Sequence, residues 1–276
     1  MLKINSSRSN KPPSLIKWTG SKRTISHRIF LSFPEHKRYL EPFLGGGSVL
    51  YFASTNKSIA GDIYKPLVEF WQLVKEDPAL IIADYTEKWA MLQNDFPDYF
   101  YKIRKAFNDN PAGLELSFLA RTCVNGIIRF NSEGKFNNSF HLSRKGMDPG
   151  NFKKVVSAWS VILHNVDFFC QDYKDTIEMA KEKDLVYLDP PYANSKQRYF
   201  SEINHSELLE QLESLNKRNV YWALSYDGHR GDFEYKHKMP TELYKRKIVI
   251  NSGLSAVKKV LSNSQEIVKE SLYVNF

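Results

Sequence analysis

The segment Asp189-Pro190-Pro191-Tyr192 combines the residue types needed to hold a planar amine. It follows Leu185–Leu188, an apolar run typical of a central parallel strand, at the end where open α/β sheets bind ligands. The two prolines stiffen the backbone and lack N–H donors, so the Pro190 carbonyl is free to accept a hydrogen bond. That carbonyl and the Asp189 carboxylate can take both hydrogens of an exocyclic amine, while the Tyr192 ring stacks on the base. A rigid turn that only ends a strand is the structural alternative.

A second feature is the glycine run Gly45-Gly46-Gly47, which interrupts the expected short strand Tyr39–Phe43. Glycines allow positive φ angles and let the backbone approach a ligand closely. Leu50 stands where a dinucleotide fingerprint needs its third glycine, and Asp62 lies 17 residues after Gly45, where an acid receives ribose hydroxyls. The pattern favours a nucleoside cofactor without a pyrophosphate. A turn that serves only the fold explains the glycines equally well.

The elements that must position these residues alternate between strand and helix at both ends of the chain. A glycine-containing turn opens a helix at Lys22–Ser32, and a second short strand at Ser58–Gly61 ends at Asp62. From Ile63 to Trp159 the pattern changes to long helices rich in aromatic residues, and Ile127–His141 is typical of a β-hairpin. We therefore predict one α/β domain that is interrupted by an insertion.

Composition narrows the class of protein. The 276 residues are 42% hydrophobic and 25% charged, as in globular proteins. The net charge of +8 suits a polyanionic partner, although a solvated basic surface gives the same value. No apolar run reaches the ~18 residues of a membrane span, and the polar N-terminus lacks a signal-peptide core. Two cysteines, Cys123 and Cys170, exclude a disulfide framework and a Cys-rich zinc module, so we expect no metal site and a cytoplasmic location.

Four blocks, in this order, resemble the Dam family of DNA adenine-N6 methyltransferases: Trp18–Lys22, Glu41–Ser48, the hairpin segments Asn125–Asn131 and Gly134–Asn137, and Asp189–Tyr192. The resemblance spans nearly the whole chain from Lys17. It implies an α/β, Rossmann-like fold for S-adenosylmethionine-dependent methyl transfer, with a mixed, mostly parallel sheet and a mainly helical insertion carrying a β-hairpin. The expected organisation is a flexible leader at 1–14, a catalytic cofactor-binding domain at 15–62 plus 160–276, and a target-recognition domain at 63–159.

The resemblance also assigns roles at the site. It implies methylation of adenine N6 in double-stranded DNA after base flipping. Lys22 would neutralise the cofactor carboxylate, Asp62 would receive the ribose diol, and Asp172 would lie at the cofactor adenine. The catalytic residues would be Asp189, Pro190, Pro191 and Tyr192, and the residues that bind S-adenosylmethionine would be Trp18, Lys22, Phe43, Gly45, Gly47, Asp62, Asp172 and Asp189.

The insertion supplies the expected DNA contacts. Arg129 could bind a guanine edge, with a phosphate contact or a surface ion pair as the alternative. Asn125 could contact a base or support the gap left by the flipped adenine. The full expected set is Asn125, Arg129, Asn131, Lys135, Arg144 and Lys145. Because the segments 137–141 and 251–263 depart from the family pattern, we do not assume a GATC target.

Other interpretations remain open from the sequence. Related tetrapeptides also serve cytosine N4 and the amide of a protein glutamine, and a decayed methyltransferase fold could act as a non-catalytic DNA-binding module. A nicotinamide-dependent oxidoreductase leaves Asp189–Tyr192 unexplained. We expect a monomer that belongs to a restriction–modification system, with a cognate endonuclease as a functional rather than physical partner. An orphan enzyme or a phage protein would carry the same residues.

Overall fold

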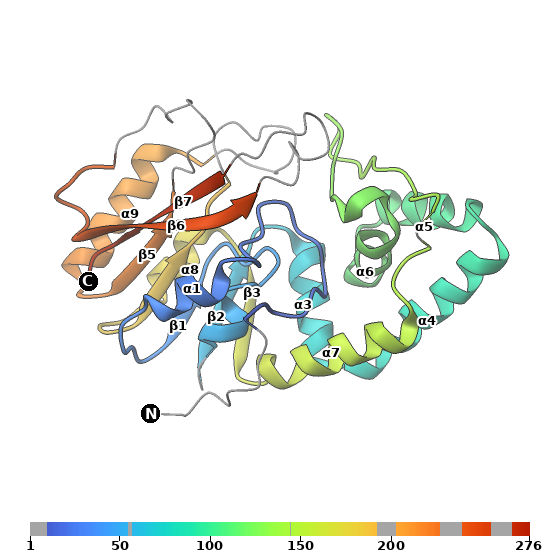
Figure 1. Ribbon diagram of the computed structural model, residues 1–276, viewed down its shortest axis with the longest axis horizontal. Coiled ribbons are helices and arrows are strands. Elements are labelled where there is room, and N and C mark those ends of the chain that lie inside the picture. Colours follow the sequence, from blue (N-terminus) through green and yellow to red (C-terminus); the bar gives the residue numbers. More distant parts are fainter. Residues whose placement is uncertain (1–9, 55–56, 144, 192–202, 227–238, 255–266) are drawn as a thin grey trace.

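A twisted sheet lies in one half of the molecule, beside a helical part (Figure 1). The computed structural model describes residues 10–54, 57–143, 145–191, 203–226, 239–254 and 267–276. In these residues seven strands pair in the order β3-β2-β1-β4-β5-β7-β6. The first five are mutually parallel, and β7 runs antiparallel to both β5 and β6. The predicted α/β fold with a mixed, mostly parallel sheet is confirmed.

The strands are β1 (Tyr39–Glu41), β2 (Ser58–Asp62), β3 (Val166–Cys170), β4 (Leu185–Leu188), β5 (Tyr221–Ser225), β6 (Arg246–Leu254) and β7 (Ile267–Val274). The α-helices are α1 (Ser26–Leu31), α2 (Leu50–Ala53), α3 (Lys65–Glu76), α4 (Pro78–Asn94), α5 (Asp98–Asp109), α6 (Gly113–Thr122), α7 (Pro149–Leu163), α8 (Tyr173–Glu178) and α9 (His205–Lys217). A short 3₁₀ turn, η1, spans Val124–Gly126.

Side chains of the central strand alternate between two apolar layers, as a strand buried on both faces requires. On β4, Leu185 and Tyr187 join the layer that contains α1, α2, α3 and α7. Val186 and Leu188 join the layer that contains α8 and α9. All four strand residues are buried. The apolar run read from the sequence therefore marks the position where helices cover both faces of the sheet.

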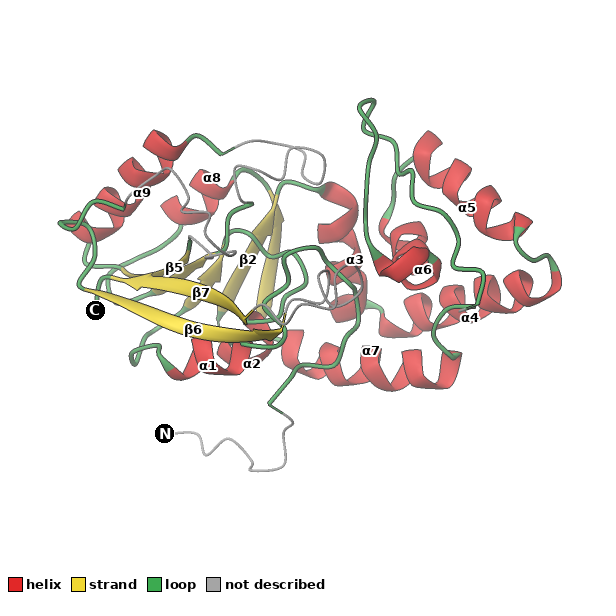
Figure 2. Ribbon diagram, turned by 45° about the horizontal axis from the view of Figure 1, so that its top comes forward, coloured by secondary structure: helices red, strands yellow, loops and turns green. Residues whose placement is uncertain are grey.

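The helical part of the molecule extends to one side of the sheet (Figure 2) and contains α4, α5 and α6. Local sequence signals mark the first residues of α4 and α7. Asp77 caps α4 and Asp148 caps α7, and each cap is followed by a proline at the first helical position. Helix α7 runs without a break across residues 159 and 160, where the expected domain boundary lies. Trp159 is buried, and its ring centroid lies 4.8 Å from that of Trp71 on α3. This contact packs α7 against the helix layer of the sheet.

The expected β-hairpin at 127–141 does not form as a laddered pair of strands. Two isolated bridges, Cys123 with Phe140 and Phe130 with Phe136, replace the ladder. Side-chain hydrogen bonds hold the backbone of this segment in place of strand pairing. Asn138 Nδ2 donates to two backbone carbonyls, and Asn108 both donates to and accepts from the backbone of Phe136. We call residues 123–141 the recognition loop, after the role that the resemblance implies for this segment.

The end of the segment expected to be a flexible leader, 1–14, makes specific contacts with the rest of the chain. Pro12 is buried, and its carbonyl accepts a hydrogen bond from Arg23. The Pro13 carbonyl accepts from Trp159 Nε1 at 2.9 Å, and the Ser14 carbonyl accepts from Arg121. These contacts fix the backbone from residue 12 onward against α7 and α6, because each carbonyl has a specific donor.

Candidate active site

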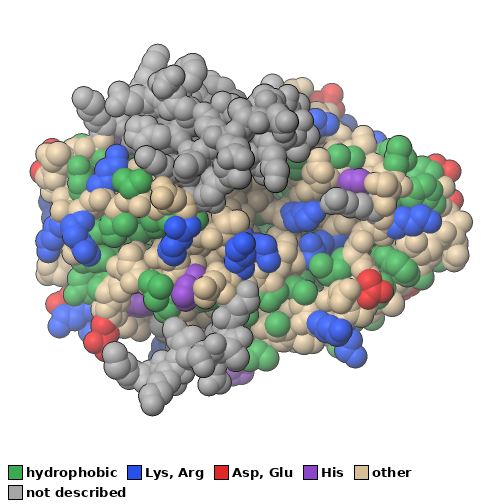
Figure 3. Space-filling model, in the orientation of Figure 1, with side chains coloured by type: hydrophobic (Ala, Val, Ile, Leu, Met, Phe, Trp, Pro, Cys, Tyr) green, Lys and Arg blue, Asp and Glu red, His purple; other side chains and the backbone are tan. Residues whose placement is uncertain are grey.

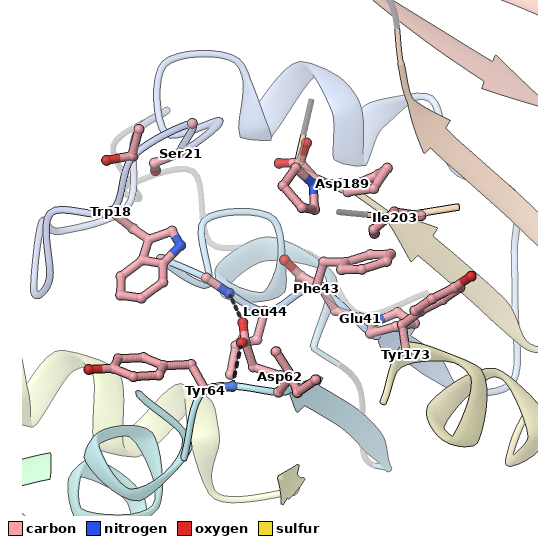
Figure 4. A pocket seen from close by; sticks show the side chains of 18 of the residues that line it. Trp18, Ser21, Glu41, Phe43, Leu44, Asp62, Tyr64, Tyr173, Asp189 and Ile203 are labelled. Carbon is pink, nitrogen blue, oxygen red and sulfur yellow. Dashed lines mark hydrogen bonds between the residues drawn. The ribbon is translucent and has the colours of Figure 1, made fainter. Parts of the chain in front are cut away.

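A cavity of about 240 Å³ opens where the parallel strands β1, β2 and β4 end (Figure 4). The strand order reverses between β1 and β4, and this is the switch point at which doubly wound sheets bind ligands. The loop after β1 supplies Gly45 and Gly47, and the end of β4 supplies Asp189. The two motifs singled out in the sequence therefore line one cavity.

Gly45 is required by both its backbone and its neighbour. Its φ angle is +47°, a left-handed conformation that L side chains rarely adopt. A Cβ atom at this position would lie 2.8 Å from Cδ1 of Trp18. The Gly45 carbonyl also accepts a hydrogen bond from Trp71 Nε1 at 3.0 Å. The indole of Trp18 can therefore lie over the glycine loop only because residue 45 has no side chain.

Asp62 ends β2 and closes the other side of the glycine loop. Its carboxylate accepts hydrogen bonds from the backbone N–H groups of Gly45 (3.1 Å) and Tyr64 (3.0 Å), drawn as dashed lines in Figure 4. Burial raises the pKa of Asp62 to about 6, although these N–H groups oppose the shift. The carboxylate holds the loop and still has lone pairs directed to the cavity, which suits a pair of hydroxyl groups.

Asp189 does not stand alone at the end of β4. Lys22 Nζ donates to Asp189 Oδ1 at 2.7 Å and lies 3.5 Å from Oε1 of Glu270 on β7. It also donates to the Gly20 carbonyl at 3.2 Å. Lys22 is 6% exposed and Asp189 18% exposed, so the ion pair is shielded from water while the carboxylate still reaches the cavity. Burial raises the pKa of Asp189 to about 6, with Lys22 opposing the shift and Glu270 adding to it.

Aromatic side chains form the walls. Phe43 and Tyr173 stack with their ring centroids 5.0 Å apart, and Trp18 lies 6.2 Å from Tyr64. Tyr64 in turn contacts Phe130 of the recognition loop edge to face at 5.5 Å. The buried Tyr173 hydroxyl has no hydrogen-bond partner among the described residues, so a polar ligand atom at this wall would satisfy it.

The expected cofactor residues come together in the structure. The cavity lining includes Trp18, Lys22, Phe43, Gly45, Gly47, Asp62, Asp172, Asp189, Pro190 and Pro191. Asp172 has a second task, because its side chain caps α8 by accepting from the Lys174 N–H. Tyr192 lies outside the described residues. Within the described ranges, no group of three or more His, Cys, Asp or Glu side chains is arranged to hold a metal ion.

Several lining residues had no signal in the sequence. Tyr64, Ile128 and Phe130 enter the cavity wall from the segment expected to be a separate domain. Glu41, quoted in the motif without a role, is buried at the cavity floor, accepts a hydrogen bond from the Tyr39 hydroxyl at 2.7 Å, and has its pKa raised to about 8 by burial. Ile128 and Phe130 reach the site only through packing between distant segments.

The expected DNA-contacting residues lie on the recognition loop and beside it. Asn125, with a φ angle of 57°, Arg129, Asn131 and Lys135 are all exposed there. Arg129 Nε donates to Asn137 Oδ1 at 2.9 Å, which orients the guanidinium. Lys145 is exposed with its ammonium 4.7 Å from the Phe96 ring centroid, and Arg144 lies outside the described residues. On the face drawn in Figure 3, basic side chains are spread from the sheet to the helical part and acidic ones are sparse.

Comparison with known proteins identifies the family. Residues 18–260 match the model for D12 class N6 adenine-specific DNA methyltransferases. The chain is 30% identical over 246 residues to the type II methyltransferase M.MjaIII of Methanocaldococcus jannaschii, covering 76% of this chain and 82% of that protein.

Two further relatives match at slightly lower identity. The DNA adenine methylase of Vibrio cholerae is 28% identical over 187 residues, and the match spans 66% of each protein. The DNA N-6-adenine-methyltransferase of Escherichia phage P1 is 27% identical over 267 residues, which is 91% of this chain and 31% of that protein. Since the family model covers most of the chain, including every block in which the sequence resembled that family, the chain belongs to the D12 class of N6 adenine-specific DNA methyltransferases.

Proposed function

We propose that the chain transfers a methyl group from S-adenosylmethionine to N6 of an adenine in double-stranded DNA. The observation that carries this proposal is that Asp189 and the loop Gly45–Gly47 line the same cavity at the switch point of the sheet. One motif suits an exocyclic amine and the other suits a nucleoside cofactor. A cavity that holds both places donor and acceptor together, and family membership names the acceptor class.

The residues present fit S-adenosylmethionine. The Asp62 carboxylate offers acceptors for a ribose diol, and the stacked pair Phe43 and Tyr173 offers an apolar face for an adenine ring. The Tyr173 hydroxyl, for which the described part of the chain offers no partner, can bond a ring nitrogen or amino group of that base. When bound, the cofactor supplies a methyl group on a positively charged sulfur, which is a good leaving group.

The chain's own residues would position the substrate amine and stabilise the charge that develops on it. Asp189 would accept one hydrogen of the adenine N6 amine, and the Pro190 carbonyl would accept the other. Both acceptors would draw the amine lone pair out of conjugation with the ring. The Asp189 carboxylate would also stabilise the positive charge that develops on N6. No covalent intermediate with the chain is required.

Access to a base in a duplex requires that the adenine leave the helix, so base flipping is part of the proposal. The recognition loop, together with α4, α5 and α6, would act as the target-recognition part. Its exposed residues Arg129 and Asn125 would contact bases, while Lys135 and Lys145 would contact phosphates. We propose that the protein acts as a monomer in the cytoplasm, within a restriction–modification system. No described helix is long and apolar enough to cross a membrane.

The proposal is tested by expressing the chain in a host that lacks DNA methylation and sequencing the plasmid for modified bases. We expect N6-methyladenine at one short sequence. The variant Asp189→Ala should abolish methylation while duplex binding, measured by gel shift, survives; the isosteric Asp189→Asn controls for folding. Full methylation by Asp189→Ala, or methylation at cytosine N4 instead, would refute the assignment.

A further inference from the structure

Glu270 is a buried carboxylate that the proposed reaction has not yet used. It lies on β7, next to β5, and its side chain is 9% exposed. The described residues that line the cavity do not include it. Glu270 therefore lies behind the site, and its contact with the site runs through Lys22, at 3.5 Å.

Lys22 is shared between two carboxylates at unequal distances. Its ammonium lies 2.7 Å from Asp189 and 3.5 Å from Glu270. Two carboxylates therefore share one ammonium in a place shielded from water. Such a cluster costs free energy to bury, and a single Lys–Asp pair would cost less. The second carboxylate therefore calls for a role other than stability.

Other titratable groups surround this cluster. Glu41 and Tyr39 face it from β1, and Tyr187 faces it from β4. Burial raises the pKa of Glu41 to about 8, so Glu41 is protonated and neutral when Asp189 titrates. Burial also raises the pKa of the two tyrosine hydroxyls, so both are neutral there too. Among these neighbours, Glu270 is the one that brings a negative charge.

We propose that Glu270 is a positioning residue that shares the Lys22 ammonium with Asp189 and thereby keeps Asp189 a strong acceptor for the hydrogens of the substrate amine. This inference rests on the proposed methyl transfer to adenine N6. An ammonium paired with Asp189 alone would draw electron density from the oxygens that must hold the amine. The Glu270 carboxylate offsets that effect, and it raises the pKa of Asp189 in addition to the shift that burial causes.

The proton balance of the methyl transfer shows why the basicity of Asp189 affects the reaction. As the bond between N6 and the methyl carbon forms, the carbon–sulfur bond breaks and its electron pair stays on sulfur. N6 then carries one proton more than the product amine, and that proton passes to the Asp189 carboxylate and on to solvent. A more basic Asp189 both orients the amine better and takes this proton more readily.

The test compares Glu270→Gln with Glu270→Asp. Glutamine keeps the size and removes the charge, whereas aspartate keeps the charge and shortens the side chain. We expect the acid limb of the kcat/KM–pH profile to move down by about one pH unit in Glu270→Gln. Glu270→Asp should restore most of the wild-type profile. Glu213→Gln, which breaks an exposed pair with Lys217 on α9, is the matched control and should leave the profile unchanged.

A second readout does not depend on activity. The titration of Asp189 can be followed by the carboxyl ¹³C shift in protein labelled at aspartate, with the signal identified by its loss in Asp189→Asn. The inference holds if the midpoint falls in Glu270→Gln and returns in Glu270→Asp. It is overturned if Glu270→Gln leaves the midpoint unchanged, or if Glu270→Asp is the more perturbed variant, as a purely structural role requires. Absence of methylation by the wild-type chain would instead refute the proposed function.

Discussion

Replacing Gly45 by alanine is expected to weaken cofactor binding as well as the folded state. Two costs arise at this residue. The left-handed φ of +47° costs an alanine about 1 kcal/mol. The new Cβ would also lie 2.8 Å from the Trp18 indole, and overpacking of this kind costs about 1–3 kcal/mol. The glycine loop cannot easily retreat, because Gly45 N–H bonds Asp62 and its carbonyl bonds Trp71. Trp18 must therefore move, and Trp18 lines the cavity.

Gly134 offers a matched control. Its φ is +74°, and a Cβ built there meets nothing within 4 Å. Gly134→Ala therefore carries the backbone cost of about 1 kcal/mol without the clash. Urea unfolding should show a comparable loss in the free energy of unfolding from the backbone strain in both variants. Gly45→Ala should show an additional loss from the clash with Trp18. Binding of S-adenosylmethionine, measured by calorimetry, should weaken roughly 5- to 150-fold in Gly45→Ala, which corresponds to the packing cost of about 1–3 kcal/mol.

The control variant should bind the cofactor as the wild type does. The reasoning would be refuted by a Gly45→Ala protein whose cofactor affinity equals that of the wild type. It would also be refuted if Gly134→Ala weakened the cofactor to the same extent, because the Trp18 contact would then explain nothing.

Four further outcomes are expected. Because burial raises the pKa of Asp189 to about 6 and the ionised form must accept the amine, kcat/KM should fall about tenfold per unit below pH 5; a flat profile from pH 5 to 8 would contradict this. The pKa of about 6 in the folded protein lies above the ordinary value of 3.8 that Asp189 has in the unfolded chain. Protonation of Asp189 therefore stabilises the fold at low pH, and this stabilisation is lost as the pH rises through about 6. Asp189→Asn should therefore gain stability over wild type above pH 6 in urea titrations, and no gain would count against that burial cost. Arg129→Ala should weaken discrimination between target and non-target duplexes by about 1–3 kcal/mol in gel shifts, with unchanged cofactor affinity; uniform weakening on all sequences would indicate a phosphate contact instead. Trp159→Phe removes the donor to the Pro13 carbonyl and should lower the free energy of unfolding by about 1–3 kcal/mol, and an unchanged value would show that this contact does not anchor the segment.

The sequence alone was sufficient where the signal is local. The apolar run Leu185–Leu188 predicted the central strand, because a strand covered on both faces has no polar side to show. The residues Asp189 and Gly45–Gly47 follow strands directly, so the carboxyl edge of a parallel sheet must bring them together. Asp62, at the end of β2, reached the same edge for the same reason.

The tertiary structure decided everything that depends on packing between distant segments. No pattern near Lys22 or Asp189 indicated Glu270, which meets them only because β7 inserts antiparallel between β5 and β6. Nor could periodicity show that α7 runs through the expected domain boundary, or that Phe130 of the recognition loop packs on Tyr64 at the cavity wall. Strand and helix patterns act over a few residues, whereas the charge state and the walls of the site are set by side chains that only the folded chain brings into contact.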